Sequence, residues 1–166
     1  MMNKNVQAAL DQVGGVYADL VEIANDILQD AVGDLDSIIE PVSTNPEALS
    51  NEDLRMIMMK LSIKAFSFCE IKEKAAFKSN IAETLRKEKY ATNFGAAEGS
   101  VAAKESTATL QTSAEILTEQ IYDLVADLFK VKLDSIYRVV DVIKTILTTR
   151  VNEAKLTNAT GTAAEF

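Results

Sequence analysis

The sequence contains no histidine and no tryptophan, and its 166 residues include one cysteine, two prolines and six glycines. The absence of histidine removes the most frequent general base and the most frequent zinc ligand of proteins. A single cysteine excludes a disulfide framework and a cysteine-rich metal site. So few prolines and glycines are not typical of a fold made of short strands and tight turns. We therefore predict a protein that is not an enzyme and that uses no cofactor and no metal.

Long uncharged runs are also missing from the sequence. No stretch of about 18 residues is free of charged side chains, so no membrane span is predicted. The first residues, MMNKNVQAALDQVGG, contain charged Lys4 and Asp11 and do not resemble a secretory signal. The lone Cys69 is expected to be a small, reduced hydrophobic residue. These features predict a cytoplasmic protein.

Apolar residues recur with helical spacing over three long tracts, at about 3–40, 51–94 and 101–155, followed by a loose tail at 156–166. In the first tract the spacing alternates between four and three residues, which is typical of a coiled coil. We expect this seam to form the interface with a further subunit or a partner protein. Its main residues are Val6, Leu10, Val13, Tyr17, Leu20 and Ile27.

The other two tracts carry similar apolar seams. The seam of the second consists of Leu54, Met58, Leu61, Ala65, Phe68 and Ala75. The seam of the third consists of Leu110, Ala114, Leu117, Ile121, Leu124, Leu128 and Val131, and then changes phase through Ile136, Val139, Ile143 and Ile146. Methionines at 56, 58 and 59 suit either core packing or a groove, and we favour core packing.

Local signals mark where the tracts begin and end. The first tract is predicted to stop at Glu40-Pro41. Asn45 followed by Pro46 is typical of a cap and a short helical turn. Ser50, with an acidic residue three positions later, resembles a capping box that opens the second helix. Two glycines in the segment FGAAEGS at 94–100 indicate the turn of a helical hairpin.

These patterns predict an all-α fold, an elongated bundle of three long helices with coiled-coil-like packing in a single domain, residues 1–155. Helices of this length rarely bury their apolar faces within one compact monomer. A homo-oligomer is therefore expected.

Charge is unevenly distributed along the chain. Residues 1–53 carry eleven acidic and one basic residue, whereas residues 54–90 carry nine basic and four acidic residues. Six cations of the second tract fall within an arc of about 120° on a helix. They are Lys60, Lys64, Lys74, Lys78, Arg86 and Lys89. Either this basic arc lies beside the acid-rich first helix, or it is a track for the phosphates of single-stranded DNA.

The second alternative defines a set of candidate nucleic-acid contacts. They are Lys74, Lys78, Arg86, Lys87, Lys89 and Tyr90, with Phe94 as a further ring on which bases can stack. The acidic pairs of the third tract, Glu115 with Glu119 and Asp123 with Asp127, lack the histidines of a dimetal site. We expect those carboxylates to form a solvated face.

Four segments support a family resemblance over residues 55–150. They are KEKAAFK at 72–78, RKEKY at 86–90, EGSVAAKE at 98–105 and DVIKTI at 141–146. Their order and charge pattern resemble those of phage recombination mediators of the UvsY type, small helical proteins that act as ring-like oligomers and load a recombinase onto single-stranded DNA. The resemblance implies a phage-encoded accessory protein of DNA recombination or replication, located in the host cytoplasm.

Two alternatives use other features of the same sequence. An acidic inhibitor or decoy would occupy the basic surface of a nucleic-acid-binding host enzyme through Asp19, Glu22, Asp26 and Asp30. A phage structural or assembly factor would need only the heptad surfaces. Binding to DNA distinguishes the accessory protein from both alternatives.

Overall fold

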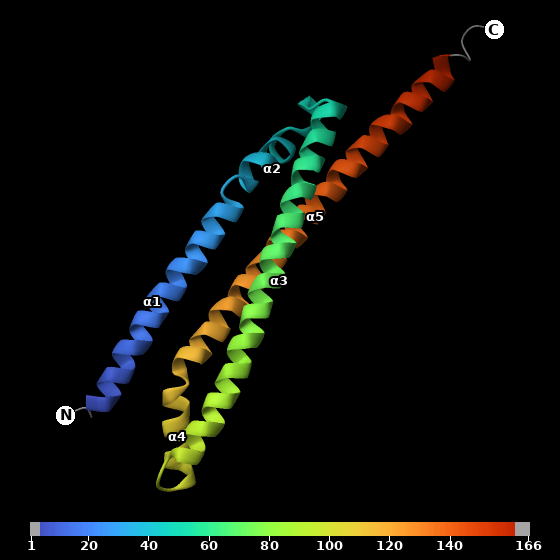
Figure 1. The fold of residues 1–166 in the computed structure, drawn as a ribbon. Coiled ribbons are helices and arrows are strands. Elements are labelled where there is room, and N and C mark those ends of the chain that lie inside the picture. The colour runs from blue at the N-terminus through green and yellow to red at the C-terminus, as the bar shows by residue number, and fades with distance from the viewer. Residues whose placement is uncertain (1–3, 162–166) are drawn as a thin grey trace. The chain divides into compact units, whose positions relative to one another are not determined.

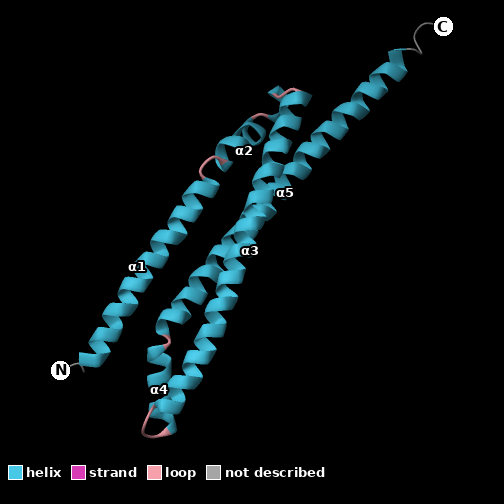
Figure 2. Ribbon diagram, viewed as in Figure 1, coloured by secondary structure: helices cyan, strands magenta, loops and turns pink. Residues whose placement is uncertain are grey.

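The computed structural model describes residues 4–161, apart from the side chains of 4–13, 16, 30 and 158–161. Within residues 4–161 the chain forms five α-helices and no strand, which confirms the all-α prediction (Figure 2). The elements are α1 (Lys4–Val32), α2 (Leu35–Thr44), the short 3-10 helix η1 (Pro46–Ala48), α3 (Asn51–Ala96), α4 (Val101–Gln111) and α5 (Ser113–Gly161).

The first predicted helix is divided at Gly33-Asp34, where α1 ends and α2 begins. Glycine weakens a helix relative to alanine, which suits a break at Gly33, whereas Asp34 makes no side-chain capping hydrogen bond to α2. The predicted stop at Glu40-Pro41 is wrong, because α2 continues through Pro41 to Thr44. A proline inside a helix removes one backbone hydrogen bond. The helix ends within one turn of it, where the Asn45 N–H donates to the Pro41 carbonyl at 3.2 Å.

The third predicted helix is divided at Thr112. The buried Thr112 hydroxyl donates to the carbonyl oxygens of Ala108 at 3.0 Å and Thr109 at 3.2 Å. The Ser113 hydroxyl donates to the Leu110 carbonyl at 2.7 Å. Hydroxyls that bond back to the preceding turn compete with the helical hydrogen bonds and bend helices. Apolar spacing carries no information about this competition, so the break was not predicted.

The predicted caps and turns are confirmed. Asn45 Oδ1 accepts a hydrogen bond from the Ala48 N–H of η1 at 3.4 Å. Ser50 and Asp53 form the predicted capping box, since Asp53 Oδ2 accepts from the Ser50 N–H at 3.0 Å and Ser50 Oγ accepts from the Asp53 N–H at 3.1 Å. The hairpin turn lies between α3 and α4, where Gly99 has a φ of +105°.

The chain divides into two compact units, and α3 and α5 contribute to both. Unit 1 comprises Met1–Ala31 with Cys69–Lys130, and unit 2 comprises Val32–Phe68 with Val131–Phe166. Figure 1 labels the helices from which these segments come. The buried residues of unit 1 include Leu20, Ala75, Ser79, Ala82, Ala108, Thr112, Val125 and Phe129. Those of unit 2 include Leu35, Val42, Leu54, Leu61, Ala65, Phe68, Leu133, Ile136 and Ile143.

In unit 2, Arg150 of α5 holds the connection that precedes α3. Its guanidinium donates to the Pro46 carbonyl at 3.0 Å and to Asn51 Oδ1 at 3.0 Å. This contact fixes the start of α3 beside the C-terminal part of α5. The helix α5 itself extends to Gly161, so the part of the predicted tail from 156 to 161 is helical, and 162–166 lie outside the described residues.

The predicted apolar seams are confirmed in α3 and partly wrong in α5. All the predicted α3 seam residues are buried except Met58, which is half-buried. In α5, Ile136 and Ile143 are buried as predicted, whereas Leu124, Leu128 and Val131 are exposed. The residues that face the core there are Val125, Phe129 and Leu133. Apart from Leu110, the seam residues up to Val131 lie within α5, where apolar residues occupy more than one face, so apolar spacing selected the wrong face.

Candidate interaction surface

Polar contacts join α3 to α5 in antiparallel order within unit 1. The half-buried Arg86 donates from Nε to Glu119 Oε2 at 2.7 Å, and the buried Ser79 donates from Oγ to Asp123 Oδ1 at 2.6 Å. Lys89 forms an ion pair with Glu115. We call these three contacts the α3–α5 ladder. They pair side chains that the sequence alone does not relate.

One carboxylate of the ladder is only half satisfied. Glu115 accepts from Lys89 through Oε1, and its Oε2 is buried with no hydrogen-bond partner among the described residues. A charge-assisted hydrogen bond is worth more than a neutral one, and removal of one partner from a desolvated pair leaves the other uncompensated. The Glu115 carboxylate thus lies largely out of solvent, whereas the Lys89 side chain that bonds to it is exposed.

The basic arc faces α5 at three of its positions. Besides Arg86 and Lys89, Lys78 contacts α5, with its Nζ 3.4 Å from the Tyr122 hydroxyl and 5.0 Å from the centre of that ring. The expectation that the carboxylates of α5 form a solvated face is wrong for Glu115 and Glu119, because they are half-buried against α3.

Of the other three candidate nucleic-acid contacts, Lys74 and Lys87 are exposed and Tyr90 is half-buried. Lys74 and Lys87 each form an ion pair four residues back along the helix, with Glu70 and Glu83, both at 2.6 Å. The bonding lysine lowers the pKa of each of these two glutamates. Tyr90 stacks on Phe94 with 6.2 Å between ring centres. Among the six candidates, Lys78, Arg86 and Lys89 thus contact α5, whereas Lys74 and Lys87 form ion pairs within α3.

In unit 2 one cation of the arc contacts an acidic residue near the N-terminus of α2. Lys64 Nζ lies 2.5 Å from Asp34 Oδ1, and this hydrogen bond lowers the pKa of the Asp34 carboxyl. Asp34 belongs to the acid-rich N-terminal region, which one of the two alternatives from the sequence puts beside the basic arc.

The predicted interface seam of α1 is only partly described. The side chains of Val6, Leu10 and Val13 lie outside the described residues. Of the others, Tyr17 is exposed, Ile27 is half-buried and Leu20 is buried within the chain.

Large apolar side chains of α3 are exposed to solvent in unit 1. Phe77 is 66% exposed, Leu85 51% and Ile81 44%, and they line a shallow open groove with Asn80, Thr84 and Glu88. We call Phe77, Ile81 and Leu85 the α3 apolar stripe. Single exposed apolar residues are ordinary, whereas a contiguous group marks an interaction surface.

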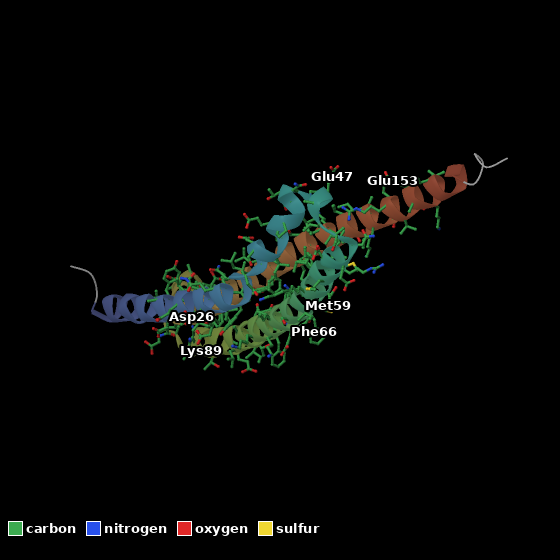
Figure 3. The ribbon with its side chains drawn as sticks, turned by 90° about the horizontal axis from the view of Figure 1, so that it is seen from above. Asp26, Glu47, Met59, Phe66, Lys89 and Glu153 are labelled. Atoms are coloured by element: carbon green, nitrogen blue, oxygen red, sulfur yellow. The ribbon has the colours of Figure 1, made fainter. Side chains whose placement is uncertain are left out.

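Unit 2 has an apolar surface of its own. Phe66 is 75% exposed, and Met56, Met59 and Ile63 are exposed as well. Figure 3 labels Met59 and Phe66 among the side chains of α3. Core packing is therefore the wrong prediction for Met56 and Met59. Met58 and Met59 line a groove with Ile136, Tyr137 and Val140 of α5, and Arg55 and Lys144 also line it.

These exposed apolar surfaces are visible in the sequence as apolar residues outside the predicted seam of α3. Several buried positions of α3 have an apolar residue two positions away, on the other side of the helix, which is more than a surface helix needs. Examples are Met56 after Leu54, Phe66 before Phe68 and Phe77 after Ala75. No group of three acidic or thiol side chains in the described part of the chain is arranged to hold a metal ion. None of the helices between residues 4 and 161 has the length and apolarity needed to cross a membrane.

Comparison with protein-family models gives no match. Searches of curated proteins and of solved structures give no match either.

Proposed function

We propose that this protein is a non-enzymatic helical accessory protein that acts through contact with other proteins, and that further copies of itself are its first partners. The exposed apolar side chains of α3 carry this proposal, because a helix that already has one buried seam gains nothing in the monomer from a second apolar face. In this proposal the long helices of different copies pair in the coiled-coil manner that the sequence predicts.

The proposed setting is DNA recombination or replication in the cytoplasm of a phage-infected host, which rests on the resemblance to recombination mediators. Single-stranded DNA is the second proposed partner. The observation that favours it is the position of Lys74 and Lys87, whose ion pairs with Glu70 and Glu83 are exposed. An exposed pair of this kind contributes little to stability, so a phosphate competes for the lysine easily.

Two measurements on the purified protein test the proposal. Sedimentation velocity over a wide range of protein concentration gives the state of association, and we expect more than one copy per particle. Fluorescence anisotropy of a labelled single-stranded oligonucleotide, titrated at low and at moderate salt, gives DNA affinity and its salt dependence. A monomer at every concentration would contradict the self-association that we propose.

Variants separate the DNA contact from protein contact. Replacement of Lys74 and Lys87 with glutamine is expected to weaken DNA binding and reduce its salt slope, because two cations are lost. The matched control is Lys104→Gln on α4, which removes one cation elsewhere in unit 1. An oligomer that does not bind DNA at low salt would contradict the DNA partner and favour an assembly factor.

A further inference from the structure

We propose that two copies of this chain pair antiparallel along α3 in unit 1, about a two-fold axis beside Ile81. This inference rests on the self-association in the proposed function. It adds which surface of the chain pairs, in which direction the two helices run and in which register they meet. The occupant of the α3 apolar stripe is thus the same stripe of a second copy.

The stripe points away from the core of its own unit. At about 100° per residue, Phe77 and Leu85 each lie within about 40° of Ile81 around the helix axis. The residues of α3 that face inward, Ala75, Ser79 and Ala82, are buried. The face around Ile81 is therefore available to a partner.

The stripe is symmetric about its central residue. In an antiparallel pair, a residue that precedes Ile81 lies opposite the residue that follows Ile81 by the same number of positions. Phe77 then meets Leu85 of the second copy, four positions on either side, and the two Ile81 side chains meet each other. Such a self-complementary patch is what a two-fold interface requires.

Charges bound the stripe at both ends and select the direction. Lys74 precedes Ile81 by seven residues and Glu88 follows it by seven, so each lies within about 20° of Ile81 on the helix. In the antiparallel pair, Lys74 of one copy lies opposite Glu88 of the other, twice by symmetry. In a parallel pair the lysines would face each other, as would the glutamates, and like charges repel.

Both side chains are exposed and can reach a second copy. Lys74 has an exposed pair with Glu70, which is weak, and the side chain of Glu88 is exposed and has no ion pair among the described residues. An apolar stripe with a cation at one end and an anion at the other suits a second copy better than a nucleic acid, which presents only negative phosphates.

Charge reversal with rescue tests the pairing. Either Lys74→Glu or Glu88→Lys is expected to weaken self-association about tenfold, because two ion pairs between the copies become repulsive. The double variant is expected to restore it. Rescue within one chain is not possible, because the two positions are about 21 Å apart along α3. The matched control is Lys87→Glu, which lies about 120° from Ile81 and is expected to change nothing.

Disulfide formation tests the direction in a Cys69→Ala background. Ile81→Cys is expected to cross-link with itself. Thr92→Cys is expected to cross-link with a separate Glu70→Cys chain and not with itself, since two residues at position 92 would be about 33 Å apart. Circular dichroism checks that each variant remains helical.

The outcomes separate this inference from the proposed function. A Thr92→Cys homodimer would show parallel pairing and overturn the inference. Self-association that survives without the Ile81→Cys cross-link and without an effect of charge reversal would overturn it too, while leaving the proposed function in place. A monomer at every concentration contradicts both.

Discussion

Arg150 donates a hydrogen bond from Nη1 to the carbonyl oxygen of Leu49 at 2.8 Å, across 101 residues of sequence. The same guanidinium also reaches the carbonyl oxygens of Pro46 and Glu47. The last carbonyls of a helix have no partner within it, and a cation is favourable at that end. Arg150 therefore supplies hydrogen bonds to the Glu47 and Leu49 carbonyls at the end of η1, and the Pro46 carbonyl accepts both from Arg150 and from the Leu49 N–H.

We expect Arg150→Ala to lower the free energy of unfolding by about 1.5–3 kcal/mol, the range for hydrogen bonds to charged groups. Arg150→Lys is expected to lose a large part of this, because an ammonium group lacks the planar fork that serves several acceptors. Urea unfolding followed by circular dichroism measures both. Arg138→Ala, at an exposed arginine of the same helix, is the control, and an equal loss there would contradict the specific role of Arg150.

The α3–α5 ladder predicts coupling between Arg86 and Glu119. Each single replacement, Arg86→Met or Glu119→Gln, is expected to lower the free energy of unfolding by about 1–2 kcal/mol, because a half-buried charge loses its partner. The double variant is expected to lose less than the two singles together. A double-mutant cycle from urea unfolding gives the coupling, and additive losses would show that the 2.7 Å contact does not stabilise the fold.

Stability is expected to fall in acid. Hydrogen bonds from the Ser50 hydroxyl and backbone N–H hold the pKa of the Asp53 carboxyl below its ordinary 3.8. The hydrogen bond from Lys64 acts in the same way on Asp34. A carboxyl with a lowered pKa in the folded state stabilises the fold above its ordinary pKa, and that stability is lost as the pH falls through the lowered value.

We therefore expect the Asp34 and Asp53 carboxyls to leave the urea midpoint nearly constant from neutral pH to about pH 4, and to lower it below that pH. Ser50→Ala is expected to reduce the decrease by the share that the Ser50 hydroxyl contributes at Asp53, because the hydrogen bond from the backbone N–H remains. A Ser50→Ala profile parallel to that of the wild type in acid would show that the Ser50 hydroxyl does not perturb this carboxyl.

Two glycines near the hairpin turn are expected to respond to alanine in opposite ways. Gly99 has a φ of +105°, where a side chain is strained, so Gly99→Ala is expected to lower the free energy of unfolding by about 1–2 kcal/mol. Gly95 is in α3 with open space around its Cα, so Gly95→Ala is expected to raise it by about 0.5–1 kcal/mol. Thermal unfolding of the two variants makes the comparison, and a loss at Gly95 would contradict it.

Local signals in the sequence predicted local structure well. The Ser50–Asp53 box, the Asn45 cap and the hairpin turn depend on residues within a few positions of each other, and their hydrogen bonds follow from side-chain chemistry. The inward face of α3 was also predictable, because apolar residues recur with helical spacing from Leu54 to Ala75, with Lys72 as the one exception.

Other features depend on residues far apart in the chain, or on competition that apolar spacing does not record. Apolar residues keep their helical spacing across Gly33 and Thr112, so neither helix break was predicted from the sequence. The partners of the basic arc depended on which acidic helix lies beside it, and charge counts cannot decide between α1 and α5. Arg150 was not singled out, because its acceptors are backbone carbonyls of a distant connection.

The α3–α5 ladder has a consequence for how this sequence can vary among relatives. Arg86 and Glu119 meet across the hairpin, as do Lys89 and Glu115, so a neutral or reversed charge on one helix leaves a mismatch on the other. A substitution at one of these positions should therefore be accompanied by a compensating substitution at its partner. In an alignment of related sequences, positions on α3 and α5 that face each other would then show correlated substitutions. Those correlations would give the register of α3 against α5.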